Sequence, residues 1–403
     1  MNLEIESRCN LEHRKYITDK EILRTTKDLL TIESHKEAPD RESKLVEYIK
    51  NLLETESISV ETKEIETNRP NIYGTIEGKE EGIELIFNGH TDTVPGLDNM
   101  DYPPFTPFLK EGAIHGRGAS DVKCAIAGML SAMIAIKRSG YDLKKSVMFA
   151  GVIDEEERSK GTEQMVKDKI LSKYVVLGEP TNLRVGVAHK GMEWIEVSFK
   201  GLGTHGSRPY MGINAVYMAS EFNRLIYEEL EPKVLKRKDN LLGPGSINVG
   251  KIVGGSDPNV VPSSCSVQID RRWLPEESLD FIYDEIEDIA KKASKKFGGD
   301  YEIRPMRELT ASMKNRPHYL DPNDQFVKNA LDIVEEVTGV WDTPRDFQAW
   351  SDAGILSNHT DSKCIILGPA NINQAHSNDD FCTVDELFKA TEIYYKLIKK
   401  LCM

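Results

Sequence analysis

His90 and Asp92 follow a mostly apolar run, Ile83 to Phe87, and are well suited to chemistry by type and spacing. In an extended chain, side chains two positions apart project from the same face, so the imidazole and the carboxylate point together. One of them can bind a metal ion while the other orients it, as metal-binding histidines are usually held. A hydrogen-bonded structural histidine near a strand end is the plainer alternative, so this pair decides nothing alone.

The same arrangement recurs along the chain. The apolar runs 146–152, 174–178 and 364–368 are also followed by acidic residues or a histidine, and another acid precedes the apolar segment 122–137. In open α/β sheets, sites lie beyond the carboxyl ends of the strands. The sequence therefore predicts one shared site that contains His90, Asp121, Glu155, Glu156, Glu179 and His376.

This set matches the ligand chemistry of a borderline metal. The two imidazoles and the carboxylates of Asp121, Glu156 and Glu179 suit Zn²⁺, which accepts nitrogen and oxygen donors. Five ligands are too many for one catalytic zinc that keeps an open position, but they suit two ions that share a carboxylate. Glu155 is then left over beside a ligand and is the natural general base.

The elements that position these residues predict an α/β fold. Continuous β-rich runs alternating with helical patterns are typical of a mostly parallel sheet with helices on both faces. Between residues 191 and 306 the order becomes β-α-β-β-α-β, that of the ferredoxin-like split βαβ unit, with Trp194, Tyr217 and Phe281 interpreted as core. We expect one domain formed by residues 1–190 and 307–403, and an α+β domain, residues 191–306, inserted into it.

Charge and composition exclude several classes of partner. The 403 residues carry 52 Lys and Arg against 66 Asp and Glu, a net charge of −14, which argues against nucleic acid or an anionic membrane. No long apolar run indicates a membrane span, and the charged N-terminus does not resemble a secretory signal. The six cysteines show no CxxC spacing and are interpreted as reduced, so a cytoplasmic location is expected.

Five strings carry a resemblance to a known family. In this order and spacing, GHTDTVP, GRGASDVK, DEEE, GEPT and AHSNDD resemble the M20 family of zinc peptidases and amidohydrolases, nearest its acetylornithine deacetylase and succinyl-diaminopimelate desuccinylase branch. The likeness runs from about residue 20 to near the end. It implies a zinc-exopeptidase-like fold and two Zn²⁺ ions, with Co²⁺ or Mn²⁺ as substitutes. It also implies a hydrolase that cleaves the amide bond of an N-acyl amino acid through a metal-bridging hydroxide.

The resemblance also implies a role for each site residue. His90 and Glu179 would be the terminal ligands of one ion. Glu156 and His376 would be those of the other, and Asp121 would bridge the two. Asp92 would orient His90, and Glu155 would be the base.

The inserted segment resembles the lid of the same family. The string GLGTHGS contains His205, and the family's histidine at this place reaches the active site of the partner subunit, so a homodimer through the inserted domain is expected. Asn259 and Arg272 match substrate-binding positions. Three features depart from the family pattern. Asp380 stands where a Glu is usual, which puts a contact that supports the ligands in doubt. Met100-Asp101-Tyr102 replaces the aromatic residue common before the PPF loop, and residues 1–18 have no counterpart.

Plainer interpretations remain open at this stage. Asp121 could be a helix N-cap, the acidic run a solvated loop, and Arg272 a partner of Asp270. An M20-type di- or tripeptidase or carboxypeptidase acting on short peptides is the alternative enzyme. A binding protein that kept the fold is disfavoured, because the base and every ligand are present. A two-carboxylate glycosidase leaves both histidines unexplained.

Overall fold

The chain forms two compact units in a computed structural model that describes residues 11–313 and 315–403. The discontinuous unit comprises the chain up to Ala188 together with Tyr319–Met403, and the inserted unit is His189–His318. The inserted unit reaches beyond residue 306 because the segment that follows is tied to its first strand. Met306 donates its backbone N–H to Trp194 O at 2.9 Å, and Arg307 pairs with Glu193 at 2.7 Å.

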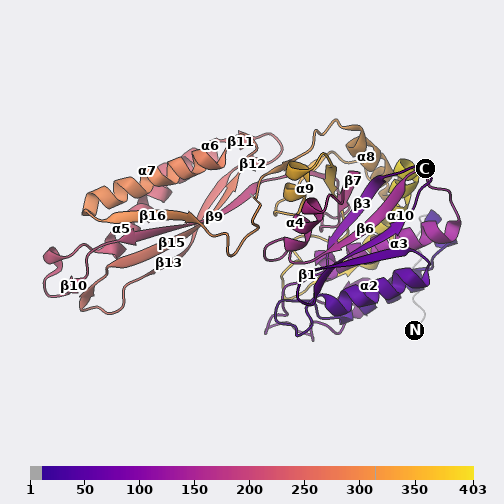
Figure 1. The fold of residues 1–403 in the computed structure, drawn as a ribbon, viewed down its shortest axis with the longest axis horizontal. Coiled ribbons are helices and arrows are strands. Elements are labelled where there is room, and N and C mark those ends of the chain that lie inside the picture. The colour runs from indigo at the N-terminus through magenta and orange to yellow at the C-terminus, as the bar shows by residue number, and fades with distance from the viewer. Residues whose placement is uncertain (1–10, 314) are drawn as a thin grey trace. The chain divides into compact units, whose positions relative to one another are not determined.

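A mixed sheet forms the centre of the discontinuous unit, in the order β1-β2-β6-β3-β7-β19-β8-β17, with β18 also paired to β8 (Figure 1). Its central strands β6, β3, β7 and β19 are parallel, whereas β1 and β2 form an antiparallel hairpin at one edge and β8 meets β19 antiparallel. The hairpin needs only a tight turn, in which Asn68 has a φ of 59°. The strands are β1 Ser59–Glu66, β2 Arg69–Ile76, β3 Ile83–His90, β6 Ser146–Val152, β7 Ser172–Leu177, β8 Gly186–His189, β17 His318–Tyr319, β18 Arg345–Asp346 and β19 Lys363–Ile366.

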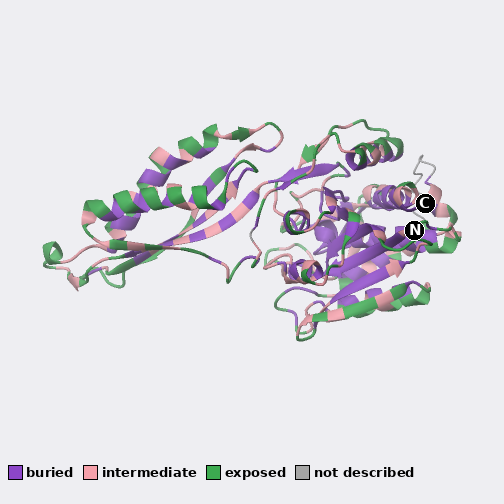
Figure 2. Cartoon of the chain, turned by 45° about the horizontal axis from the view of Figure 1, so that its top comes forward, coloured by how far each residue is buried: buried purple, intermediate pink, exposed green. Residues whose placement is uncertain are grey.

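Helices cover both faces of this sheet, so the expected α/β fold is confirmed. Ile86 of β3 belongs to a core that includes Leu356 of α9, whereas the ring of its neighbour Phe87 lies 5.3 Å from that of Tyr394 of α10. Both faces of β3 are therefore buried, and Figure 2 shows most strands of this sheet in purple. The helices are α1 Asp19–Thr31, α2 Ser43–Thr55, α3 Cys124–Ser139, α4 Lys160–Lys167, α8 Gln325–Thr338, α9 Ala353–His359 and α10 Val384–Cys402.

Helix α3 lies in the core, and its residues from Cys124 to Ile136 are buried on every side of the helix. Together with the preceding π-helical turn η2, Ala119–Lys123, it is long and apolar enough to cross a membrane by length and composition. Its apolar window is, however, fully buried inside the protein. Gly128 allows the close approach of α10, since a Cβ there would lie 3.3 Å from the Tyr394 ring.

A small sheet and a short helix complete the discontinuous unit. Strands β4 Phe108–Lys110, β5 Ala113–His115 and β20 Phe381–Thr383 form the sheet, in the order β20-β5-β4. The 3-10 helix η1, Glu12–Lys15, buries His13 against Glu392 of α10, with Nδ1 and Oε2 2.7 Å apart. The segment 1–18, which has no counterpart in the family pattern, is therefore packed against α10 at η1. Its residues 1–10 lie outside the described residues.

The inserted unit has the expected ferredoxin-like topology. Four antiparallel strands stand in the order β13-β15-β9-β16, and the helices α5 and α7 follow the first and third strands of the chain order. The elements are β9 Gly191–Lys200, α5 Ala215–Leu225, η4 Ile226–Leu230, α6 Glu231–Lys236, β13 Ser246–Gly254, β15 Ser264–Trp273, α7 Leu279–Phe297 and β16 Asp300–Pro305, with the short pieces β10 Thr204–His205, η3 Pro209–Met211, β11 Lys238–Asp239, β12 Gly243–Pro244 and β14 Val260–Val261.

The interpretation of Tyr217 and Phe281 as core residues is wrong. Their side chains are exposed on α5 and α7, 59% and 41% respectively. The helix faces packed on the sheet are instead occupied by smaller aliphatic residues such as Ala219 and Ile282. An aromatic residue on an amphipathic helix does not by itself identify the buried face.

Candidate metal centre

His90 is the last residue of β3 and is almost fully buried. Its Nε2 lies 2.9 Å from Asp121 Oδ1, and its Nδ1 lies 3.0 Å from the backbone oxygen of Asp92 and 3.6 Å from Asp92 Oδ1. The Asp92 carboxylate accepts the backbone N–H groups of Glu155 at 3.2 Å and Glu156 at 3.0 Å. Asp92 thus joins the β3 end to the acidic loop after β6.

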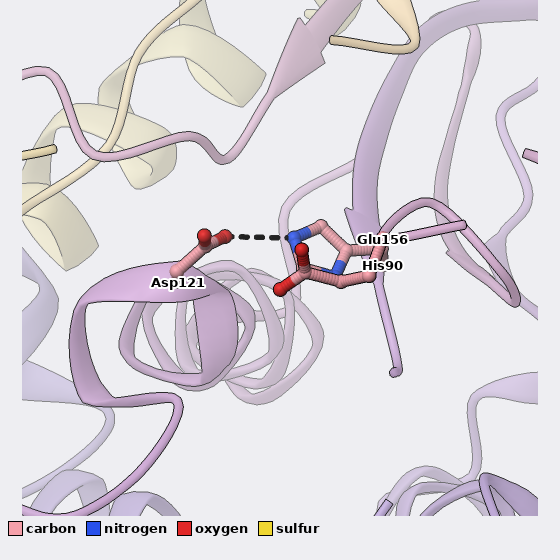
Figure 3. Close-up of side chains that lie close together, drawn as sticks. All are labelled: His90, Asp121 and Glu156. Atoms are coloured by element: carbon pink, nitrogen blue, oxygen red, sulfur yellow. Dashed lines mark hydrogen bonds and ion pairs between the residues drawn. The ribbon is translucent and has the colours of Figure 1, made fainter. Parts of the chain in front are cut away.

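Asp121 lies in the π-helical turn before α3, and it interacts with both histidines. Its second oxygen, Oδ2, is 3.3 Å from His376 Nε2. Figure 3 shows Asp121 and His90 pointing toward one another, with Glu156 beside them. One ligand atom from each of these three residues lies within 4.8 Å of the other two. Asp121 therefore occupies a central place between donors from different strands.

Glu155 and Glu156 follow β6 in a sharp turn. Asp154, with a φ of 72°, begins this turn, and its backbone oxygen accepts the N–H groups of residues 157 to 159. Glu156 Oε1 lies 3.0 Å from His376 Nε2, whereas the Glu155 carboxylate makes no hydrogen bond or ion pair with any residue that the structure describes. The two neighbouring glutamates therefore have different surroundings.

Glu179 and His376 follow the ends of β7 and β19. Gly178, the residue before Glu179, donates its N–H to Asn88 O at 3.0 Å, which ties the end of β7 to β3. His376 adopts a φ of 58°, in the left-handed region that histidine visits more often than most residues. These two residues come from loops that lie next to each other, because Thr181 forms a β-bridge with Asn371.

The electrostatics of the cluster are those of crowded, buried carboxylates. Burial, followed by the charge of Glu179, raises the pKa of Glu155 well above its usual range. Burial likewise raises the pKa of Glu179 to about 8. Hydrogen bonds to Asp121 and Glu156 raise the pKa of His376 to about 10. So much buried negative charge is costly unless cations compensate it.

The residues present fit bound metal ions. Two imidazoles and three carboxylates are the nitrogen and oxygen donors that zinc and similar ions accept. The raised carboxyl pKa values indicate that the site favours added positive charge, which a divalent ion would supply. We therefore interpret this cluster as a metal centre.

The three other predicted site residues belong to the inserted unit. His205 of β10 pairs with Val260 of β14, and Gly206 donates its N–H to Asn259 O at 2.6 Å, so His205 and Asn259 lie on adjacent segments. A Cβ on Gly206 would lie 2.8 Å from the Asn259 backbone. Arg272 projects from the sheet face opposite the buried core and contacts Asp270 Oδ1 at 3.0 Å.

Three buried acids that support the cluster were not predicted as site residues. Asp380 accepts bonds from the Gly118 and Ser120 N–H groups at 2.8 and 2.9 Å, and it thereby fixes the turn before Asp121. Asp154 pairs with Arg69 at 2.9 Å, and Asp352, which Thr162 contacts, has its pKa raised to about 6 by burial. Asp154 directly follows an apolar run and Asp380 ends the string AHSNDD, so both carried a sequence signal, whereas Asp352 did not.

Comparison with known proteins identifies the family. The sequence pattern described as "Peptidase family M20/M25/M40" matches residues 86–400. The chain belongs to the M20 peptidase family. As a member, it is a metallohydrolase that acts on amide or peptide bonds.

Relatives of this M20 enzyme differ in the substrates that their names give. It is 29% identical over 369 residues to an acetylornithine deacetylase of Aliivibrio salmonicida, covering 89% of this chain and 92% of the relative. It is 25% identical over 417 residues to a probable succinyl-diaminopimelate desuccinylase of Staphylococcus epidermidis, covering 95% and 98%. A dinuclear metal-binding M20 peptidase of Bacillus subtilis shares the fold with a TM-score of 0.70 and 15% identity, covering 94% of this chain and 97% of that one.

Proposed function

We propose that this M20 enzyme hydrolyses the amide bond of N-acyl amino acids with two zinc ions, for which Co²⁺ or Mn²⁺ can substitute. The observation that carries the proposal is the donor cluster in which His90, Asp121 and Glu179 are buried and Glu156 contacts His376, with an additional carboxylate, Glu155, beside it. The relatives named as a deacetylase and a desuccinylase support the acyl-amino-acid class.

His90 and Glu179 would hold one ion, Glu156 and His376 the other, and Asp121 both. Bound there, the ions would polarise the scissile carbonyl and lower the pKa of the attacking water. The protein's own contribution is to position the proton carrier. Glu155 would accept a proton from the water and deliver it to the departing amine, a role that suits a carboxyl group whose pKa burial raises well above its usual range.

Arg272 is proposed to bind the α-carboxylate of the substrate, with Asn259 as an additional donor. A guanidinium forks two hydrogen bonds onto a carboxylate. Arg272 lies on the open face of its sheet and is bound to Asp270 through Nε, so its terminal nitrogens can face a ligand. Wild type should prefer an N-acyl amino acid over its α-carboxamide by about 30- to 1,000-fold in kcat/KM, and Arg272→Ala should lose that preference. An equal preference in both proteins would exclude this role.

We also propose a homodimer that forms through the inserted unit, with His205 acting in the partner's site. The ground for this proposal is the set of exposed apolar residues near His205. Leu202, Tyr210 and Met211 are exposed by 55%, 78% and 61% and flank His205 in the sequence. Exposed apolar groups of this kind often mark an interface. Mixing His205→Ala with Glu155→Gln protein should restore part of the activity after subunit exchange. No recovery after demonstrated exchange would remove the role in trans.

A peptidase acting on di- or tripeptides, or a carboxypeptidase, is the second candidate, since solved relatives of the same fold are named as peptidases. The deciding experiment is a panel of N-acyl amino acids and dipeptides incubated with metal-loaded protein, with release of free amine as the readout. The proposal predicts that N-acyl amino acids turn over faster. Faster turnover of dipeptides would favour the second candidate.

A further inference from the structure

Arg69, the first residue of β2, is a buried arginine in a group of carboxylates. Its Nε donates to Glu42 Oε2 at 2.9 Å, and its Nη2 also contacts the Glu42 carboxylate. Its Nη1 donates to Glu66 Oε2 at 2.6 Å, and its Nη2 lies 2.9 Å from Asp154 Oδ1. Glu42 and Asp154 are almost fully inaccessible to solvent, so this guanidinium compensates the charge of two buried acids.

Asp154 begins the turn that carries Glu155 and Glu156. Its φ of 72° lies in the left-handed region, which is unfavourable for a residue with a side chain, so the turn depends on contacts that fix it. The backbone oxygen of Asp154 is used inside the turn, where it accepts the N–H groups of residues 157 to 159. Its carboxylate instead ties the turn to β2 through Arg69, and its ion pair with Arg158, within the same turn, is longer, 3.9 Å.

The start of α2 fixes the position of Arg69. Glu42 is the residue before this helix, and its backbone oxygen accepts the Val46 N–H at 2.9 Å. The carboxylate of Glu42 binds two nitrogens of Arg69, and this fork sets the direction in which the guanidinium points. Arg41, next to Glu42, lies 3.8 Å from Glu157 Oε2 and adds a second contact between the start of α2 and the turn. Two elements outside the turn, β2 and α2, therefore hold it.

A small cavity of about 50 Å³ places Arg69 beside the metal centre. The residues that line it include Arg69, Glu42, Asp92 and Glu156. The hydrogen bonds and ion pairs of Arg69 that the structure describes nevertheless join it to acids other than the predicted metal ligands. Arg69 can therefore influence the metal centre through the turn that begins at Asp154.

We propose that Arg69 is a positioning residue for the metal centre: through Asp154 it holds the turn 154–159 in the conformation that presents Glu155 and Glu156. This inference rests on the proposed function, in which Glu156 is a metal ligand and Glu155 is the base. Without the guanidinium, the Asp154 carboxylate would be buried without its partner, a state unfavourable enough to displace the turn. Both glutamates would then leave their places together.

The test is a double-mutant cycle on Zn²⁺ affinity, measured on zinc-loaded protein by competition with a chelator. Arg69→Gln and Asp154→Asn should each lower the affinity for the more weakly bound ion by about 10- to 100-fold. The double variant should bind no more weakly than either single variant, since both changes break the same contact. Losses that multiply in the double variant would overturn the proposal, because Arg69 would then not act through Asp154.

Arg69→Lys is the conservative variant. It keeps the charge but not the fork, so it should lose less Zn²⁺ affinity than Arg69→Gln. If Arg69→Gln does not fold, Arg69→Lys and Asp154→Asn take its place in the cycle. An Arg69→Lys protein that binds Zn²⁺ as tightly as wild type, together with an unchanged Asp154→Asn protein, would equally overturn the role.

Glu392→Gln is the matched control for a loss of folding stability alone. Glu392 is also a buried acid with an ionisable partner, His13, but it belongs to α10 and not to the turn. This variant should unfold at lower denaturant concentration and keep the Zn²⁺ affinity of wild type. The same outcome in Arg69→Gln and Asp154→Asn would show that their ion pair serves stability only, and it would contradict the proposal.

Zn²⁺ affinity does not depend on the substrate, so this test is separate from that of the proposed function. Equal affinities in wild type and all Arg69 and Asp154 variants would remove the role of Arg69 even if N-acyl amino acids are hydrolysed. Lowered affinities that do not multiply in the double variant would support the role even if dipeptides prove to be the better substrates.

Discussion

Glu155 and Glu156 are neighbours in the chain, but the structure gives them different surroundings. Glu156 contacts His376 at 3.0 Å, whereas Glu155 is half-buried and faces the charge of Glu179. Glutamine keeps the shape of either side chain and removes its charge. The pair therefore offers matched variants that separate a base from a ligand.

Glu155→Gln should retain metal and fold while its turnover falls by about 10²-fold or more, because proton transfer is lost. Glu156→Gln should instead lower the ratio of metal to protein after dialysis, since a ligand is removed. Elemental analysis and turnover of both variants provide the measurement. Near-normal turnover of Glu155→Gln would show that the base has been misassigned.

At the residue scale, the sequence indicated the metal-type residues because all of them except Asp121 come after an apolar run, and Asp121 directly precedes one. Arg69 and Asp352 were missed as supporting residues, and the contacts of Asp380 were left in doubt, because the partners of these residues are distant in the chain. Asp380 bonds to residues 260 to 263 positions away, and Arg69 and Asp154 are 85 positions apart. No local pattern predicts such pairs, and the roles assigned to the ligands remain predictions.

At the scale of elements, the turn before α3 depends on Asp380 of the segment before β20. This carboxylate accepts bonds from Gly118, Ser120 and Arg117, whose side chain is buried. The carboxylate of Asp380, where the family usually has a Glu, thus reaches three groups of this turn.

Asp380→Asn should weaken metal binding by about 10- to 100-fold, because an amide presents N–H donors where donors already point and the turn that carries Asp121 loosens. Metal affinity is measured by titration with a competing chelator. Asp379→Asn is the matched control, since the Asp379 side chain is 64% exposed, and it should change affinity little. Equal affinities of the Asp380 variant and wild type would contradict this positioning role.

The element order of both units could be predicted because apolar periodicity and strand composition are local signals. The antiparallel edges of the large sheet could not be predicted, because an apolar run does not reveal whether its strand pairs parallel or antiparallel with the next strand. The sequence pattern also did not predict where the inserted unit ends. Its last residues are held by bonds such as Met192 N–H to Asn315 O at 3.0 Å.

At the scale of the whole molecule, the two ends of the described chain are joined by a buried pair. Glu392 of α10 accepts bonds from His13 N at 3.0 Å and His13 Nδ1 at 2.7 Å. Burial raises the pKa of Glu392, but the bonds from His13 outweigh it and the net pKa is lowered below 4.5. A carboxyl group with a lowered folded-state pKa contributes stability above its unfolded pKa and loses it as pH falls.

Glu392→Gln should therefore lower the free energy of unfolding by about 1.5–3 kcal/mol at pH 7, and the difference should narrow below pH 4.5. Denaturant titrations at several pH values provide the measurement. Glu336→Gln is the control, because its side chain is 61% exposed and its pair with Lys396 should contribute little. A difference that widens on acidification would contradict the sign.

The central claim is that five residues of this chain hold two metal ions and that Glu155 moves the proton during amide hydrolysis. The most direct test is to titrate metal-free protein with Zn²⁺ while following turnover of an N-acyl amino acid, in parallel with Glu155→Gln. Turnover should rise and level off at two equivalents, and the variant should take up the same two ions with turnover lower by about 10²-fold. Full turnover in the metal-free protein would contradict the account. So would a Glu155→Gln turnover equal to that of wild type at two equivalents of Zn²⁺.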